Sequence, residues 1–180
     1  MRAKETTGGC SSGQKPGKQL SSSDIRWMRA ALKLAAKAGR IGEVPVGAVV
    51  VFEGRIIGRG FNQPIRRSDP SAHAEIVAMR KAAALLGNYR LTGCDLVVTL
   101  EPCLMCAGAM IHARIRRLVI GAVDEKGGAV LSNQRVLESG RANHRFEVVD
   151  GVLEEECRTQ LLEFFRERRR LGQTLKPGPA

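Results

Sequence analysis

The sequence lacks the long apolar runs of a membrane protein. None of its segments approaches the about 18 consecutive apolar residues that a membrane-spanning helix needs, and no apolar segment near the N-terminus has the form of a secretory signal. Aromatic residues make up only 4% of the 180 residues, but 43% are hydrophobic, which suffices for one folded domain and excludes wholesale disorder. These absences exclude an integral membrane protein, and we expect a cytoplasmic protein with no membrane partner, with an organelle as the alternative location.

A disulfide framework is also lacking. The five cysteines are an odd number, and two of them form a Cys-x-x-Cys motif at Cys103 and Cys106. Such usage indicates a thiol or metal site in a reducing compartment.

Negative charge is scarce. The chain has 18 Asp and Glu against 29 Lys and Arg, a formal net charge of +11 with a pI near 10.1. Most of this excess lies beyond the first 24 residues. A field of this sign attracts polyanions such as RNA, DNA or an acidic membrane. A well-solvated basic surface without a partner is the alternative interpretation.

The ends of the chain differ from its middle in composition. Residues 1–23 are rich in Gly, Ser and Lys and nearly free of large apolar side chains, so they cannot bury enough surface to offset the entropy of ordering. We expect a disordered basic arm at residues 1–23, one folded domain at 24–172 and a flexible tail at 173–180.

Hydrophobic periodicity predicts helices that alternate with strands, as in a single layered α/β domain with a partly parallel sheet. A Glu53-Gly54 turn between two β-rich runs predicts a hairpin. We expect helices at residues 24–38, 71–84, 103–112 and 154–170, strands at 46–52, 55–61, 95–100, 117–122 and 146–149, and a loop at 62–70.

Two short motifs carry the candidate chemistry. His73-Ala-Glu75 and Pro102-Cys103-Leu-Met-Cys106 each lie at the predicted start of a helix. One imidazole and two thiolates are three protein ligands for Zn²⁺, which leaves a fourth tetrahedral position open, as in catalytic zinc sites. A structural zinc site would need a fourth protein ligand, and the other histidines and cysteines of the folded part are isolated in sequence: Cys94, His112, His144 and Cys157.

Glu75 is the candidate catalytic residue. It lies two positions from His73, close enough to reach a metal-activated water without itself being a ligand. A carboxylate in that place can accept a proton from the water and pass it on.

The paired motifs His-x-Glu and Pro-Cys-x-x-Cys are the signature of zinc-dependent nucleoside and nucleobase deaminases. Longer blocks extend the likeness over about residues 24–170, and through them the chain resembles the bacterial tRNA-specific adenosine deaminases of the cytidine and deoxycytidylate deaminase superfamily. These blocks are Glu43-Val-Pro-Val-Gly-Ala48, Phe61-Asn62, Asp69-Pro70, Ala72-His-Ala-Glu-Ile76, Asn88-Tyr-Arg-Leu91, Val98-Thr-Leu-Glu-Pro-Cys-Leu-Met-Cys-Ala-Gly-Ala-Met-Ile-His112, Asn143-His144-Arg145 and Phe164-Phe165-Arg166.

The resemblance implies a fold and a reaction. The fold would be a three-layer α/β/α domain over residues 24–172, with a central mixed sheet of about five strands and helices on both faces. The reaction would be hydrolytic deamination of adenosine to inosine at the wobble position of a tRNA anticodon, typically in an arginine tRNA. One Zn²⁺ per subunit would be held by His73, Cys103 and Cys106, with Glu75 as the proton shuttle. The protein would be a homodimer.

The resemblance also implies a set of RNA contacts. Asn62 would hydrogen-bond the flipped nucleotide, with a turn residue as the alternative reading. Ala74 and Leu100 would line the pocket and Val44 would help to enclose the base, although Leu100 and Val44 are equally typical of plain core. Asp124 and Lys126 would lie near the flanking nucleotides. In the closing helix we expect one Phe buried and the other near RNA, and the arginines on phosphates, so that Phe164 and Arg168 become candidate contacts.

Two other functions fit part of this pattern. A deaminase of a free nucleobase or nucleoside, such as guanine, cytosine or cytidine, would share the zinc chemistry but has no need of so basic a fold. An RNA-binding module with a structural or vestigial zinc would have no use for an intact Glu75.

Overall fold

The computed structural model describes residues 21–138, 140 and 142–172, and within this part no helix is long and apolar enough to cross a membrane. Of the predicted arm, residues 1–20 lie outside this part, as does the predicted tail at 173–180. The elements in chain order are α1 Ser22–Arg40, β1 Gly47–Phe52, β2 Arg55–Phe61, α2 Pro64–Arg67, α3 Ala74–Leu86, β3 Asp95–Leu100, α4 Leu104–Ala113, β4 Arg117–Ala122, β5 Glu147–Val149 and α5 Glu154–Arg170.

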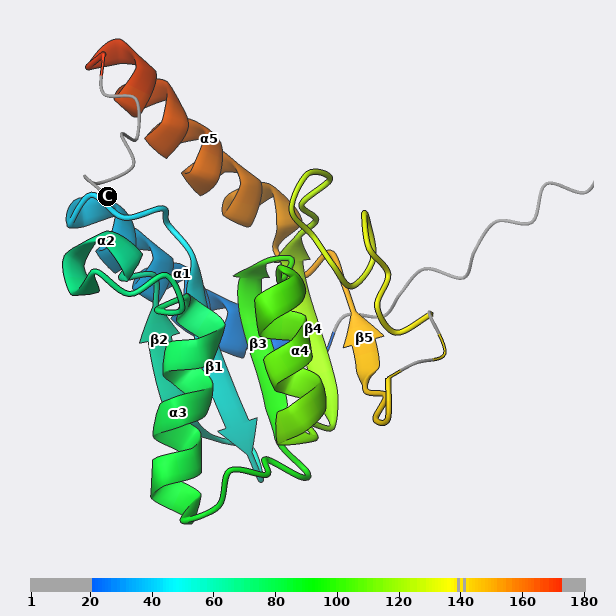
Figure 1. The fold of residues 1–180 in the computed structure, drawn as a ribbon. Coiled ribbons are helices and arrows are strands. Elements are labelled where there is room, and N and C mark those ends of the chain that lie inside the picture. The colour runs from blue at the N-terminus through cyan, green and yellow to red at the C-terminus, as the bar shows by residue number, and fades with distance from the viewer. Residues whose placement is uncertain (1–20, 139, 141, 173–180) are drawn as a thin grey trace, which may run out of the picture.

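The five strands form one mixed sheet in the order β2-β1-β3-β4-β5. β1 pairs antiparallel with both β2 and β3, whereas β3, β4 and β5 are parallel. Helices α3 and α4 lie in front of the sheet and α1 lies behind it (Figure 1). The predicted three-layer α/β/α fold with a five-stranded mixed sheet is therefore confirmed.

Alternate residues of the central strands supply two separate cores. Along β1, Ala48 and Val50 pack toward α3 and α4, while Val49 and Val51 pack toward α1 and α5. This alternation follows from the two-residue repeat of a strand, and it explains why most residues of the central strands are apolar on both faces of the sheet.

Glycine brings α3 close to β2. A Cβ atom on Gly60 would lie 2.0 Å from the carbonyl oxygen of Ala74, so only glycine fits there. The first turn of α3 thus rests directly on the backbone of an edge strand.

Two sequence predictions near α3 are corrected by the structure. The helix expected at 71–84 begins only at Ala74, because the Asp69 carboxylate accepts hydrogen bonds from the backbone N–H and hydroxyl of Ser71 and holds that residue in a turn. The segment expected to be a loop contains the short helix α2, whose first N–H groups are bound by the carboxylate of Glu43.

Candidate active site

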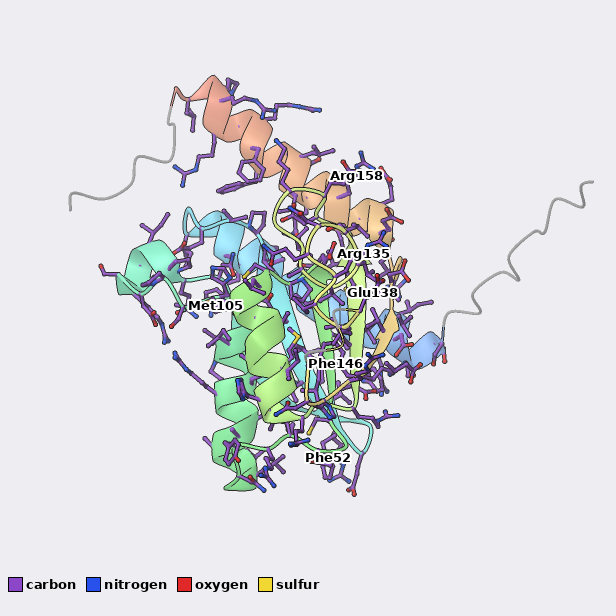
Figure 2. The ribbon with its side chains drawn as sticks, turned by 45° about the vertical axis from the view of Figure 1, so that its right-hand side comes forward. Phe52, Met105, Arg135, Glu138, Phe146 and Arg158 are labelled. Carbon is purple, nitrogen blue, oxygen red and sulfur yellow. The ribbon has the colours of Figure 1, made fainter. Side chains whose placement is uncertain are left out.

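The site lies at the edge of the sheet where β3 and β4 end. β3 ends at Leu100 and leads into α4. β2 is antiparallel to β1, as β3 is, so β2 ends at the same edge as β3, and the chain then leads through α2 to the start of α3. Met105, in the first turn of α4, and Phe52, at the end of β1, lie toward opposite ends of the sheet (Figure 2). Two helix N-termini therefore meet at the edge that carries the motif residues.

His73 lies close to Cys103 and Cys106 in space, although it precedes them by 30 and 33 residues in the sequence. His73 Nδ1 is 3.7 Å from Cys103 Sγ and 3.6 Å from Cys106 Sγ. All three ligand atoms lie within 4.8 Å of one another. Tetrahedral Zn²⁺ with ordinary Zn–N and Zn–S bond lengths separates its nitrogen and sulfur ligands by about 3.6 Å. The trio therefore fits a zinc ion with three protein ligands.

The three side chains also have the electrostatics of a cation site. The hydrogen bond from Cys106 and the contact with His73 lower the pKa of Cys103 to about 3. The same Cys103 contact raises the pKa of Cys106, because the two sulfurs share one proton. The pKa of His73 is raised by its hydrogen bond to Cys103, against the effect of burial. A divalent cation replaces these protons and satisfies both thiolates.

Glu75 lies in the first turn of α3 and is buried, with 4% of its surface exposed. Its carboxylate is not one of the grouped ligand atoms. Burial raises its pKa, and a hydrogen bond with Cys106 opposes that rise. The carboxyl group is thus next to the trio and shielded from bulk water, and its raised pKa favours the protonated form more than in a free glutamate.

Asn62 anchors the start of α3. Its Oδ1 accepts a hydrogen bond of 2.9 Å from the backbone N–H of Ala74, and its own N–H donates to Val46. Within the described residues its side-chain NH₂ has no hydrogen-bond partner, so this group can donate to a ligand. The structural role and the predicted nucleotide contact therefore use different atoms of one side chain.

The three apolar candidates lie around the same edge. Ala74 is fully buried, while Leu100 and Val44 are partly buried and pack on the core cluster beneath α3 and α4. Ala74 and Leu100 flank the two ligand-bearing segments in sequence and space.

Glu101 is a residue that sequence reasoning missed. Its buried carboxylate accepts hydrogen bonds from the backbone N–H groups of Asp124, Val130, Leu131 and Ser132 at 2.7–3.1 Å. Burial alone would raise its pKa, but these backbone donors lower it. Glu101 thereby ties the loop after β4 to the strand end that leads into Cys103.

Glu43 is the second missed residue. Its carboxylate binds α2 from the loop between α1 and β1, and it is 2% exposed. The only sequence signal for either glutamate is an acidic residue within an otherwise apolar or turn-forming block.

The predicted flanking-nucleotide residues form a turn. Asp124 Oδ1 accepts from the N–H groups of Lys126 and Gly127, each at 3.1 Å. The Lys126 side chain is exposed and the Asp124 side chain is partly exposed. Through Glu101 this turn is attached to the ligand-bearing strand end.

The closing helix differs from expectation. Phe164 is only partly buried and Phe165 is 36% exposed, so the prediction that one of them is buried is wrong for the described chain. The reason is that the last turns of α5 extend beyond the sheet (Figure 1). The two rings pack edge to face at 5.4 Å, and Arg168 lies over Phe164 while donating to the carbonyl oxygen of Gly42.

The sequence matches a family model. Residues 21–122 match the cytidine and deoxycytidylate deaminase zinc-binding region. The tRNA-specific adenosine deaminase of Haemophilus influenzae is 54% identical over 147 residues, which cover 81% of this chain and 85% of that protein. This chain belongs to the tRNA-specific adenosine deaminase family. The predicted family, the zinc cofactor and the deaminase class are thereby confirmed.

Solved structures agree with this membership. A structure from a study of A-to-I editing by tRNA:A34 deaminases at the wobble position of transfer RNA superposes with a TM-score of 0.74 at 48% identity, covering 76% of this chain and 99% of that one. The guanine deaminase of Nitrosomonas europaea superposes with a TM-score of 0.67 at 28% identity, covering 78% and 83%.

Proposed function

We propose that this tRNA-specific adenosine deaminase family member converts adenosine to inosine at the wobble position of a tRNA anticodon. The buried Glu75 beside the His73, Cys103 and Cys106 trio carries the proposal, since it provides a proton-transfer group next to an open three-ligand metal site. The relatives named as tRNA-specific adenosine deaminases support the substrate.

His73, Cys103 and Cys106 hold the zinc ion. When bound, zinc supplies the Lewis acidity that brings the pKa of water toward neutrality. The separations of 3.6 and 3.7 Å between His73 Nδ1 and the two sulfurs already suit its coordination geometry, so little rearrangement accompanies binding.

Glu75 moves the protons. Its carboxylate accepts a proton from the attacking water and delivers it to adenine N1. After the hydroxide oxygen has bonded to C6, the carboxylate takes the proton of the new hydroxyl group and passes it to the amino group, which leaves as ammonia as the C6–N bond breaks and the C6=O bond of inosine forms. Burial holds the carboxyl pKa above its usual range, which suits a group that must both accept and donate.

The adenine base is held by the residues around the edge of the sheet. The free NH₂ of Asn62 donates to the flipped nucleotide, Ala74 and Leu100 form the pocket wall, and Val44 closes it from the α1–β1 loop. Flipping is cheapest for a base that is already unpaired, as in an anticodon loop.

Residues beyond the pocket contact the rest of the anticodon stem-loop. Asp124 and Lys126 meet the nucleotides next to the target, and Phe164 and Arg168 of α5 supply a ring and a positive charge toward RNA. We expect an arginine tRNA as the substrate.

The working unit is a homodimer in the cytoplasm. The four cysteines in the described part of each chain form no disulfide, which agrees with a reducing compartment.

An inosine assay tests the function. Purified protein is incubated with an anticodon stem-loop that has adenine at the wobble position, and with free adenosine, cytidine and guanine in parallel, and products are measured by mass spectrometry. Inosine from the stem-loop alone is the expected result. Product from a free base or nucleoside alone would contradict it.

A deaminase of a free nucleobase is the second candidate function, and the superposition on a guanine deaminase is the observation that supports it. A zinc-containing RNA-binding module is distinguished by Glu75→Gln. In the enzyme this change lowers turnover by about 10²–10⁴-fold while zinc content and RNA affinity remain, whereas a module with no turnover shows no change in any of these readouts.

A further inference from the structure

The outer face of α1 carries a row of five positive charges. Arg26, Arg29, Lys33, Lys37 and Arg40 are all exposed and are spaced three or four residues apart. Residues at this spacing lie above one another on a single face of a helix. The row, which we call the basic stripe, extends about 21 Å at 1.5 Å per residue.

Within the described residues no carboxylate lies at ion-pair distance from the basic stripe, and an acidic group of residues of α5 lies beside Leu32 on the flank of α1: Glu155, Glu156 and Glu163. None of its five side chains forms an ion pair in that part of the chain, and Lys37 instead lies over the ring of Phe61 at 4.8 Å. The single acidic residue of α1, Asp24, is buried and pairs with Arg117 at 2.7 Å. By contrast, Glu167 and Arg170 pair at 2.8 Å on the surface of α5.

Such a row is unfavourable for an isolated helix. Like charges three or four residues apart repel one another along the whole row, and only Lys37 and Arg40, in the last turn, interact favourably with the helix dipole. The helix is held by its buried face, which includes Trp27 and Met28, and not by its surface charges. An anionic partner with regularly spaced charges would relieve this repulsion.

The position of the basic stripe relates it to the active site. Arg40 is the last residue of α1 and precedes the loop that carries Val44, at the edge of the sheet with the site. The other end lies near the opposite edge, because Asp24 contacts Arg117 at the start of β4. Exposed Arg59 of β2 faces the same side as Phe61, two residues further on, and widens the positive surface.

We propose that the basic stripe binds the phosphate backbone of the substrate tRNA outside its anticodon stem-loop. The proposal rests on the function proposed above, which places the anticodon loop at the site edge. A backbone with one negative charge per nucleotide matches a row of cations one helical turn apart. The stripe has no exposed apolar flank of the kind that helices on membrane surfaces insert.

The test compares full-length tRNA with the anticodon stem-loop. In the stripe variant, Arg26→Gln, Arg29→Gln and Lys33→Gln remove the three charges farthest from the site. A matched control variant carries Arg55→Gln, Lys81→Gln and Arg90→Gln, three exposed cations without a carboxylate partner in the described chain. Binding of both RNAs and of anionic phosphatidylserine vesicles is measured over a range of salt, together with inosine formation and the melting temperature.

We expect an effect only for the stripe variant and only with full-length tRNA. The affinity of this variant for the tRNA falls about tenfold at low salt, and the slope of log affinity against log salt becomes shallower by about 0.7–0.9 for each lost phosphate contact. Affinity for the stem-loop, turnover of the stem-loop and the melting temperature stay near those of the unchanged protein, as do all values of the control variant.

Several outcomes would overturn the proposal. Equal affinity of the stripe variant and the unchanged protein for full-length tRNA would show that the stripe does not bind RNA. Equal losses with tRNA and stem-loop would place it on the stem-loop itself. Loss of binding to anionic phosphatidylserine vesicles, with tRNA binding intact, would assign the stripe to membranes. If the unchanged protein makes no inosine from either RNA, the function proposed above fails instead.

Discussion

The start of α1 and the starts of α3 and α4 are held by different kinds of contact. At α1 the N-cap residue Ser21 accepts a hydrogen bond from the backbone N–H of Ser23, two residues away. At α3 and α4 the N-cap residues are His73 and Cys103, which have the same extended backbone but make no side-chain capping bond.

The difference shows what the active site requires of its helices. The side chains of His73 and Cys103 point toward the metal site and make no capping bond, so the starts of α3 and α4 lack the local cap that α1 has. α3 receives a substitute from another element, since Asn62 accepts from Ala74 N. The starts of α3 and α4 therefore depend on long-range partners, whereas the start of α1 depends on its own sequence.

Removal of zinc by a chelator should have the largest effect, and it should separate the starts of α3 and α4 from the start of α1. Activity falls about a thousandfold or more, because several kcal/mol of transition-state stabilisation are lost. Hydrogen exchange of the first turns of α3 and α4 accelerates, while that of the first turn of α1 is unchanged. Mass spectrometry with peptide resolution measures both regions in one sample. Uniform acceleration in all three helices would contradict the distinction.

Gly60→Ala should be the most destabilising single change near α3. The added Cβ meets the carbonyl oxygen of Ala74 at 2.0 Å, so helix and strand must separate, at a cost of about 1–3 kcal/mol. Gly108→Ala in α4 is the control, because its Cβ meets no atom within 4 Å and alanine favours a helix by up to about 1 kcal/mol. Urea unfolding of both variants gives the comparison, and similar losses would rule out the close contact as the cause.

Glu101→Gln should loosen the loop after β4 by an amount that depends on pH. The amide has one oxygen where the carboxylate uses two, so unfolding free energy falls by about 1–3 kcal/mol at neutral pH. Because the pKa of Glu101 is lowered by folding, its contribution is complete above the ordinary pKa of Glu and is lost as pH falls through the folded value. The melting temperatures of the two proteins should therefore converge in acid. A constant difference would mean that charge is not involved.

Ser21→Ala should have the smallest effect and lower the free energy of unfolding by about 0.5–1 kcal/mol, since only a local cap is lost.

Asn62→Ala removes the corresponding capping bond at the start of α3. It should cost more because the replaced side chain is buried, and it should also reduce inosine formation. Calorimetry and the stem-loop assay separate the two, and equal losses in both assays would remove the contrast between local and long-range caps.

The metal site could be predicted from sequence because its information is local. Two motifs of three and five residues fix the ligand types, and both fall at helix starts that periodicity also indicates. Short runs rich in β-branched residues likewise predicted the central strands of the sheet, which the structure confirms to within one or two residues.

Contacts between distant segments could not be predicted in this way. Glu43 reaches α2 across 22 residues, and Glu101 reaches the loop after β4 across 23–31. No periodicity marks such a carboxylate as buried. The expectation that one phenylalanine of α5 is buried was wrong for a related reason: the amphipathic pattern of α5 does not reveal where the sheet beneath it ends.

The pairing of Asp24 with Arg117 has a consequence for how α1 is turned about its own axis. With 3.6 residues per turn, Asp24 lies about half a turn away from the centre of the basic stripe. The guanidinium of Arg117 holds both oxygens of Asp24 and also binds Asp95 on β3, so that this side of α1 must face the sheet. A chain without this pairing would keep all five cations of the stripe but lose the charged contact that, together with the buried apolar face of α1, determines their direction.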